Sequence, residues 1–260
     1  MYNKFENLKK YLNELNEQGI CLAFSGGIDS TLLLYILREM NILTVTFNSN
    51  FQTNEEIDFT KKLCKKYGIR QALLNIDIFS NPVILNNPKD RCYHCKKMLF
   101  ENAIKIAHDN GLKYILDGTN FDDLSCYRPG RKALKELGII SPFAKFEITK
   151  KEIREFSREC GIEIFNKPST PCLATRFPYG TKLTKEKLDS VEKAEKVLKD
   201  FGFECCRFRL HDNIARIEIL PEKFHELIEK KDNVLQALKF LNIPYITFDM
   251  EGFRSGSMDL

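Results

Sequence analysis

The 260-residue sequence predicts an α/β protein with a parallel sheet in its first part and a smaller α+β domain at its end. Up to about residue 166, short apolar runs alternate with helical patterns, which is typical of parallel strands joined by helices. A segment with three prolines and no periodicity then follows, and beyond it the helices are accompanied by alternating strands. We therefore expect domains at 1–166 and 184–260, joined by an active-site loop at 167–183.

Four apolar runs predict the strands of the parallel sheet, and the segments around them have helical periodicity. The expected strands are 20–24, 42–47, 71–76 and 113–118. The expected helices are 1–18, 30–40, 54–68, 95–111 and 149–160. The last of these begins with Thr149 followed by Glu152, the pattern of a capping box.

The C-terminal domain is predicted from a helix at 184–200, strands at 206–210 and 214–220, a helix beginning at Pro221 and a final strand at 244–250. Alternation along the first of these strands places Arg207 and Arg209 on one face. From spacing alone, that face is either a solvated sheet surface or a site for an anion.

The composition is that of a soluble globular protein, with 43% hydrophobic and 29% charged residues. A net charge of +4 suits a phosphate-bearing substrate without requiring nucleic acid. No apolar run approaches the roughly 18 residues that span a bilayer, and the N-terminus lacks the apolar core of a signal peptide. We expect a cytoplasmic protein with no membrane partner.

The string "FSGGIDS" at 24–30 follows the first predicted strand and opens the next helix. Gly26 and Gly27 allow a tight turn that brings backbone amides close to phosphate oxygens, and the helix N-terminus adds positive potential. Ser25 and Ser30 can donate hydrogen bonds, and Asp29 suits a magnesium ion or a first-turn cap. A plain Gly-Gly turn is the alternative, which the strand–loop–helix context disfavours.

A second polar segment, "LDGTNFDD" at 116–123, ends the fourth predicted strand. The small residues Gly118 and Thr119 can approach a nucleotide closely, and Asp122 and Asp123 could hold magnesium. The alternative is an ordinary Asp/Asn turn. Because this segment follows a strand of the same sheet, we expect it at the same site as residues 24–30.

Nine cysteines without a secretory signal indicate buried thiols, metal ligands or nucleophiles rather than disulfides. In "RCYHCK", Cys92 and Cys95 are spaced to share one face of a helix turn. A zinc site would need two further ligands, and the chain has no second CxxC. Cys172 lies in a Pro-rich loop four residues before Arg176, a cation that would favour a thiolate and could bind a substrate phosphate.

The loop at 24–30 resembles the pyrophosphate-binding loop (PP-loop, SGGxDS) of the ATP pyrophosphatase superfamily. The resemblance implies the adenine nucleotide alpha hydrolase-like fold, with a five-stranded parallel sheet whose site lies at the carboxyl ends of the strands. It also implies that ATP with Mg²⁺ is bound by Ser25, Gly26, Gly27, Asp29, Ser30, Gly118 and Thr119. ATP would be cleaved between its α and β phosphates to adenylate a substrate.

Further motifs resemble the LarE family, the ATP-dependent sulfur transferases that make the nickel-pincer nucleotide cofactor of lactate racemase. They are "RCYHCK", "DGTNFDD", "YRPGRKAL", "CLATRFPYGT", "RFRLHDNIARIEI" and "EGFRSGSM". The resemblance implies that a substrate carboxylate is adenylated and converted to a thiocarboxylate. It also implies that Arg207 and Arg209 bind the phosphate of a small nucleotide-like substrate, and that the subunits form a homo-oligomeric ring.

The resemblance implies two sources of sulfur. Cys172 matches the position of the cysteine that some members sacrifice, leaving dehydroalanine. Other members hold a [4Fe-4S] cluster with a CxxC and one distant cysteine, here Cys92, Cys95 and Cys172, and this pattern favours the cluster. The unliganded iron could carry sulfide taken from another donor.

Three further possibilities stay open at this point. The family typically has Asp before "YRPG", where this chain has Cys126, a further candidate ligand or sulfur relay. A tRNA thiolation enzyme of the same superfamily is a second function, disfavoured by the lack of a separate basic module. A zinc-dependent nucleic-acid-binding or interaction protein is a third, from a different class.

Overall fold

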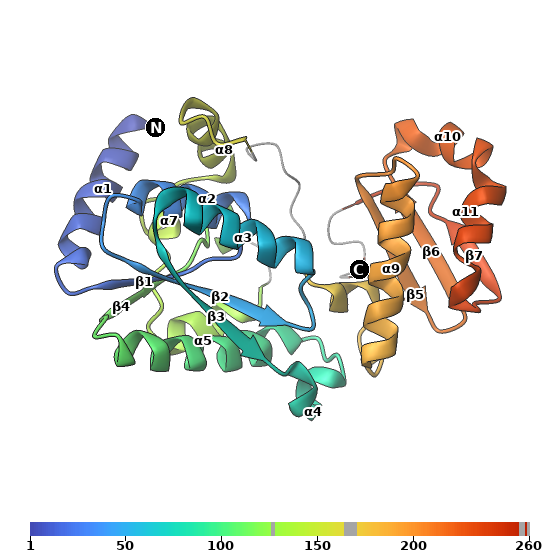
Figure 1. Ribbon diagram of the computed structural model, residues 1–260, viewed down its shortest axis with the longest axis horizontal. Coiled ribbons are helices and arrows are strands. Elements are labelled where there is room, and N and C mark those ends of the chain that lie inside the picture. The colour runs from blue at the N-terminus through green and yellow to red at the C-terminus, as the bar shows by residue number, and fades with distance from the viewer. Residues whose placement is uncertain (126–127, 164–170, 255–257, 259–260) are drawn as a thin grey trace. The chain divides into compact units, whose positions relative to one another are not determined.

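The structure, a computed structural model, describes residues 1–125, 128–163, 171–254 and 258. It divides into two compact units (Figure 1). Unit 1 comprises Met1–Ile78 and Asp90–Thr170, and unit 2 comprises Phe79–Lys89 and Pro171–Leu260. None of the described helices is both long and apolar enough to cross a membrane.

Unit 1 is built on a parallel sheet in the order β3-β2-β1-β4. Its strands are β1 (Ile20–Ala23), β2 (Leu43–Ser49), β3 (Arg70–Ile76) and β4 (Tyr114–Leu116). Its helices are α1 (Tyr2–Asn16), α2 (Ile28–Leu37), α3 (Asn54–Tyr67), α5 (Arg91–Asp109), α6 (Gly130–Glu136), α7 (Pro142–Lys145) and α8 (Lys150–Glu159), with a short 3₁₀ turn η2 (Asp122–Leu124).

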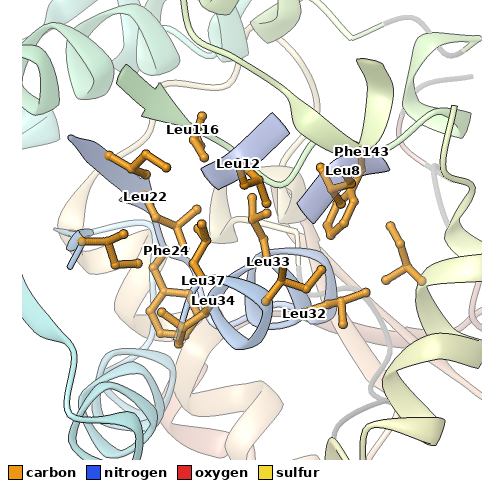
Figure 2. Packing of buried hydrophobic residues seen from close by; sticks show 14 of the residues in the cluster. Leu8, Leu12, Leu22, Phe24, Leu32, Leu33, Leu34, Leu37, Leu116 and Phe143 are labelled. Carbon is orange, nitrogen blue, oxygen red and sulfur yellow. The ribbon is translucent and has the colours of Figure 1, made fainter. Parts of the chain in front are cut away.

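The two faces of this sheet are buried against different helices because side chains alternate along each strand. On β1, Ile20 and Leu22 join one cluster with residues of α1, α2 and α8, whereas Cys21 and Ala23 join another with residues of α5. Figure 1 shows α5 on the opposite face of the sheet from α1 and α2. Figure 2 shows leucines of α1 and α2 gathered around Leu22 and Leu116.

The prediction of a fifth parallel strand is wrong for the part of the chain that the structure describes. Beyond β4 the ladder continues only as a bridge between Leu116 and Ile140. The Ile140 amide donates to the Ile115 carbonyl at 2.9 Å, and the Asp117 amide donates to the Ile140 carbonyl at 3.0 Å. Pro142 then begins α7, and proline has no amide hydrogen with which to extend the ladder.

Unit 2 contains a three-stranded sheet in the order β5-β6-β7. The β5 (Cys206–His211) and β6 (Ile214–Ile219) strands pair antiparallel, and β7 (Tyr245–Phe248) pairs parallel to β6. The long helix is α9 (Lys185–Asp200), capped by the Thr184 hydroxyl. The helix expected from Pro221 is divided into η5 (Pro221–Lys223), α10 (Phe224–Glu229) and α11 (Lys231–Ala237); η4 (Leu173–Arg176) and η6 (Lys239–Leu241) are further short turns.

Residues 79–89 belong to unit 2 although unit 1 flanks them on both sides in the sequence. This segment contains the end of η1 (Ile78–Ser80) and α4 (Pro82–Leu85). The buried Asn87 side chain donates to the Pro178 carbonyl at 2.7 Å. The amides of Gly180 and Leu183 donate to the carbonyls of Asn87 and Leu85, both at 2.8 Å. Residues 79–89 therefore stabilise the segment that follows Cys172. The sequence did not predict this contact.

Candidate active site

The loop after β1 has a conformation that depends on its glycines. Gly26 has a φ of +74°, and a Cβ there would lie 3.0 Å from the Thr60 methyl group. Gly27 is the N-cap of α2 and provides no side-chain cap. The first-turn amides of α2 therefore lack the cap that Ser, Asp or Asn would supply, and can serve an anion instead.

The two serines of this loop meet each other. Their hydroxyl oxygens lie 3.1 Å apart, and the Ser30 hydroxyl donates to the Gly27 carbonyl at 3.0 Å. Ser25 is exposed, whereas Ser30 is buried. Ser30 thus fixes the turn, and Ser25 presents a hydroxyl at its surface.

The segment after β4 is packed against the start of α2, because β4 and β1 are neighbours in the sheet. A Cβ on Gly118 would lie 2.9 Å from the Ser30 amide nitrogen, so only glycine fits there without a shift. The Asn120 side-chain amide donates to Asp29 Oδ1 at 3.2 Å. The two loops that the sequence predicted at one site are thus brought together at the carboxyl ends of β1 and β4, where the chain connections diverge to either side of the sheet.

The acidic residues of this second loop have local structural partners. Asp117 is buried and accepts hydrogen bonds from the hydroxyls of Thr119 and Ser141. Asp123 accepts from the Asn120 amide at 3.2 Å and pairs with Arg128 at 3.0 Å. Asp122 accepts from the Lys150 amide at 2.7 Å. Asp29 differs from these carboxylates in its position, because it lies in the first turn of α2, where it could hold a cation beside a bound anion.

Lys150 also belongs to this site, although no sequence motif of the site includes it. It is the first residue of α8, and its Nζ lies 2.5 Å from Asp29 Oδ2. The predicted capping box of Thr149 and Glu152 is present and fixes the start of α8. A lysine at the first position of a helix opposes the helix dipole. This unfavourable position of a positive charge was the signal in the sequence that could have indicated a functional role for Lys150.

Cys92 and Cys95 lie in the first turn of α5, as the sequence predicted, and α5 begins at Arg91. Cys92 is exposed and Cys95 is half-buried. His94 pairs with Asp90 at 3.2 Å between Nε2 and Oδ2. A Cβ on Gly130 would lie 3.2 Å from the Cys92 carbonyl oxygen, so α6 packs tightly against this turn.

Two thiols one turn apart, one of them exposed, fit a metal cluster that takes soft ligands. Within the described ranges, no three His, Cys, Asp or Glu side chains are grouped as a metal site. Cys126, the further candidate ligand, lies outside the described residues.

Cys172 lies in unit 2, directly before η4, and its side chain is half-buried. Its carbonyl accepts a hydrogen bond from the Thr175 hydroxyl at 2.9 Å. Cys92 and Cys95 lie in unit 1. Cys172 therefore belongs to a different unit from the other two proposed ligands.

Arg176 is 1% exposed, and protein acceptors occupy all three of its guanidinium nitrogens. Nε and Nη2 donate to the two carboxylate oxygens of Glu195 at 2.7 and 2.9 Å. Nη1 donates to the Pro171 carbonyl and to the Thr175 hydroxyl, each at 2.9 Å. Burial opposes the charged form, but the hydrogen bonds and charge of Glu195 raise the Arg176 pKa overall. This geometry favours a structural role over the direct phosphate contact expected from the sequence.

Arg207 and Arg209 are 7% and 5% exposed, so the alternative of a solvated sheet face is wrong. Arg209 forms a bidentate pair with Glu218 at 2.6 and 2.8 Å and donates to the Thr175 carbonyl at 2.8 Å. Arg207 donates to the Cys206 carbonyl at 2.6 Å and lies 4.8 Å from the centroid of the Phe253 ring.

The buried charges of unit 2 have a positive excess. Its buried charged side chains, among those described, are three arginines and two glutamates: Arg176, Arg207, Arg209, Glu195 and Glu218. Burial, followed by the charge of Arg176, lowers the Arg207 pKa. A lowered pKa means that burial makes the charged form of Arg207 less favourable than it is in water.

The fold and the α2 loop together define an ATP-dependent enzyme of the PP-loop class. Residues 19–85 match the family described as Queuosine biosynthesis protein QueC. A 7-cyano-7-deazaguanine synthase of Clostridium botulinum is 26% identical over 52% of this chain and 71% of its own length. The matched residues 19–85 include the loop between β1 and α2.

More extensive similarity identifies the family. The pyridinium-3,5-bisthiocarboxylic acid mononucleotide synthase of Lactiplantibacillus plantarum is 37% identical over 93% of this chain and 89% of its own length. An uncharacterised protein of Synechocystis sp. is 36% identical over 99% of this chain and 97% of its own length. The chain belongs to the family of this synthase, the LarE family, as its motifs predicted.

Proposed function

We propose that this protein is an ATP-dependent sulfur transferase that converts a carboxylate of a pyridinium-dicarboxylate mononucleotide into a thiocarboxylate. The observation that carries the proposal is the uncapped α2 terminus behind Gly26 and Gly27, joined through Asp29 to the loop after β4. Membership of a family whose L. plantarum member is named for a bisthiocarboxylic acid mononucleotide supports the substrate class.

In this reaction a substrate carboxylate oxygen attacks the α-phosphorus of ATP, and pyrophosphate leaves with the bonding electron pair. The acyl adenylate then has AMP as its leaving group, and a sulfur nucleophile displaces it from the carbonyl carbon. The first-turn amides of α2 and the exposed Ser25 hydroxyl would hold phosphate oxygens, while the buried Ser30 hydroxyl keeps the turn in place through the Gly27 carbonyl. The close packing of Gly118 on α2 leaves Thr119 at the edge of the same site.

Mg²⁺ fits the part-exposed Asp29 carboxylate, because this ion commonly binds to one or two carboxylates together with substrate phosphates and water. Asp29 would hold the ion beside the pyrophosphate that leaves. Arg207 and Arg209 are the proposed contacts of the substrate phosphate, and their neighbouring positions on one face of β5 support this role.

We further propose Cys92, Cys95 and Cys172 as the ligands of a [4Fe-4S] cluster. The exposed Cys92 and half-buried Cys95 on one helix turn, and the half-buried Cys172, support this assignment. Bound by three cysteines, the cluster would supply an iron without a protein ligand, on which external sulfide could be held. In the competing route, sulfur from Cys172 joins the acyl carbon, and elimination then breaks its Cβ–S bond to leave dehydroalanine.

Anaerobic purification followed by iron, acid-labile sulfide and zinc analysis tests the cluster. We expect a brown protein with about four irons per chain, and loss of that iron in Cys92→Ala and Cys95→Ala. Cys205→Ala is the matched control, because Cys205 is also half-buried and burial raises its thiol pKa. A colourless protein that holds zinc would contradict the cluster and support the zinc-binding alternative.

Mass spectrometry of Cys172 after turnover separates the two sulfur sources. An intact cysteine is expected, and dehydroalanine at this position would establish sacrifice.

A parallel assay with tRNA tests the proposed substrate. If it gave a thiolated tRNA product, the substrate would be nucleic acid and not the proposed small mononucleotide. The ring of subunits implied by the family resemblance is a further prediction, which light scattering of the purified protein would check.

A further inference from the structure

The pair formed by Lys150 and Asp29 lies at the start of α2, where the proposed nucleotide phosphates would bind. Lys150 Nζ is 2.5 Å from Asp29 Oδ2, and the side chains are 29% and 21% exposed. The other oxygen of Asp29 accepts from the Asn120 amide. Both carboxylate oxygens of Asp29 therefore already have donors when no cation is bound.

The backbone of Lys150 is firmly held, whereas its ammonium group has solvent access. Its amide donates to Asp122, and the preceding Thr149 forms the capping box with Glu152. The side chain can therefore change partner by rotation about its own bonds while α8 stays in place. A part-exposed ion pair with a single close contact contributes little free energy, so this exchange costs little.

Charge balance gives the exchange a direction. Asp29 lies in the first turn of α2, and its carboxylate would repel a phosphate bound at the same helix terminus. Lys150 neutralises that carboxylate in the resting site. When a magnesium ion binds to Asp29, the ion takes over this neutralisation, and the lysine is released beside the phosphate oxygens.

We infer that Lys150 is a phosphate-binding residue that exchanges partners, pairing with Asp29 in the resting site and with a phosphate oxygen of bound Mg²⁺–ATP. The inference deepens the proposed function and rests on it, because it needs ATP to bind at the α2 loop. It assigns Lys150 two effects of opposite sign. The lysine strengthens nucleotide binding, and it competes with Mg²⁺ for Asp29.

Binding of the non-hydrolysable analogue α,β-methylene-ATP, measured by calorimetry over a series of Mg²⁺ concentrations, tests both effects. We expect Lys150→Met to weaken binding at saturating Mg²⁺ by about tenfold, the effect of one charge-assisted hydrogen bond. The Mg²⁺ concentration for half-maximal binding should fall in the same variant. Lys150→Arg should retain most of the affinity, because it keeps a donor of the same charge.

Lys151→Met is the matched control, because Lys151 is the next residue of α8 and its 85% exposed side chain pairs only weakly with Glu155 at 3.9 Å. A purely structural link between α8 and α2 predicts no fall in the Mg²⁺ requirement. An affinity of Lys150→Met within about twofold of the control, or a Mg²⁺ requirement that rises, would overturn the exchange. Failure of the unaltered protein to bind the analogue would instead overturn the proposed nucleotide site.

Discussion

The ion pairs of the two units differ in burial and in geometry. In unit 1, the Asp29–Lys150 pair is part-exposed and has one close contact. In unit 2, the Arg209–Glu218 pair is bidentate, with side-chain exposures of 6% and 0%. The first pair can be broken by a competing cation or anion, whereas the second can be broken only by uncovering a buried charge.

This difference separates binding residues from residues that maintain the fold. Losing one partner of a buried pair leaves a charge without compensation and costs several kcal/mol, whereas an exposed pair contributes between about zero and 1 kcal/mol. The arginines that resemble a phosphate-binding set are thus also part of the core of unit 2. The effect of substituting these arginines on the free energy of unfolding must therefore be measured before any loss of activity is assigned to substrate binding.

The largest effect is expected for Glu218→Gln, which removes the carboxylate shared by Arg209 and Arg216. We expect a loss of roughly 3–5 kcal/mol in the unfolding free energy, because a buried guanidinium is left uncompensated. Urea unfolding followed by fluorescence of the tyrosines would measure it. Glu229→Gln, at an exposed pair with His225, is the control and should change stability by less than about 0.5 kcal/mol. Equal effects of the two substitutions would remove the distinction between buried and exposed pairs.

A smaller loss, roughly 2–3 kcal/mol, is expected for Arg176→Lys, which keeps the charge but loses the two-pronged contact with Glu195. The Pro171 carbonyl would also lose its donor, so alkylation of Cys172 by iodoacetamide should accelerate. Peptide mapping of the modified cysteines would detect this change. Arg158→Lys, on the exposed surface of α8, should alter neither quantity. An unchanged alkylation rate would show that Arg176 does not hold the Cys172 segment.

Lys150→Met should change the unfolding free energy by less than about 1 kcal/mol, because its ion pair is part-exposed. Stability and nucleotide binding would then respond very differently to the same substitution. Thermal unfolding without nucleotide supplies the measurement, with Lys151→Met as reference. If Lys150→Met lowered the unfolding free energy as much as Arg176→Lys does, the Lys150–Asp29 pair would have to be counted among the ion pairs that stabilise the fold.

The smallest effect concerns pH and His211 at the end of β5. Burial, followed by the charges of Arg216 and Arg209, lowers its pKa below the ordinary value of about 6.5. The folded state therefore binds the proton less readily than the unfolded state does. The stability contributed by neutral His211 is complete above about pH 6.5 and is lost as the pH falls through the lowered folded pKa. In His211→Asn, unfolding curves should lose part of their pH dependence in this window, and an unchanged profile would contradict the assignment.

Most of the secondary structure could be predicted because hydrophobic periodicity and capping residues determine it locally. The four strands of unit 1 begin within one residue of their expected positions, and α8 begins at its capping box. The fifth strand, which the resemblance implied without a position, is reduced in the described part of the chain to a bridge at Ile140, because Pro142 begins a helix two residues later. The contact of residues 79–89 with the segment around Pro178 joins positions about ninety residues apart, which periodicity cannot detect.

The sequence predicted those residues of the candidate site that belong to a recognisable motif, and it missed those that reach the site from elsewhere in the chain. The glycines, Ser30 and Asp29 follow directly from the strand–loop–helix order, whereas Lys150 reaches Asp29 from a helix 121 residues away in sequence. Alternation placed Arg207 and Arg209 on one face but could not say that the face is covered. Their burial depends on tertiary packing in unit 2, which no local pattern encodes.

The excursion of residues 79–89 into unit 2 means that neither unit is a continuous piece of the gene product. A fragment that begins at residue 171 would lack the Asn87 side chain and the carbonyls to which Gly180 and Leu183 donate. Unit 2 therefore cannot be removed, exchanged or expressed separately by a single cut.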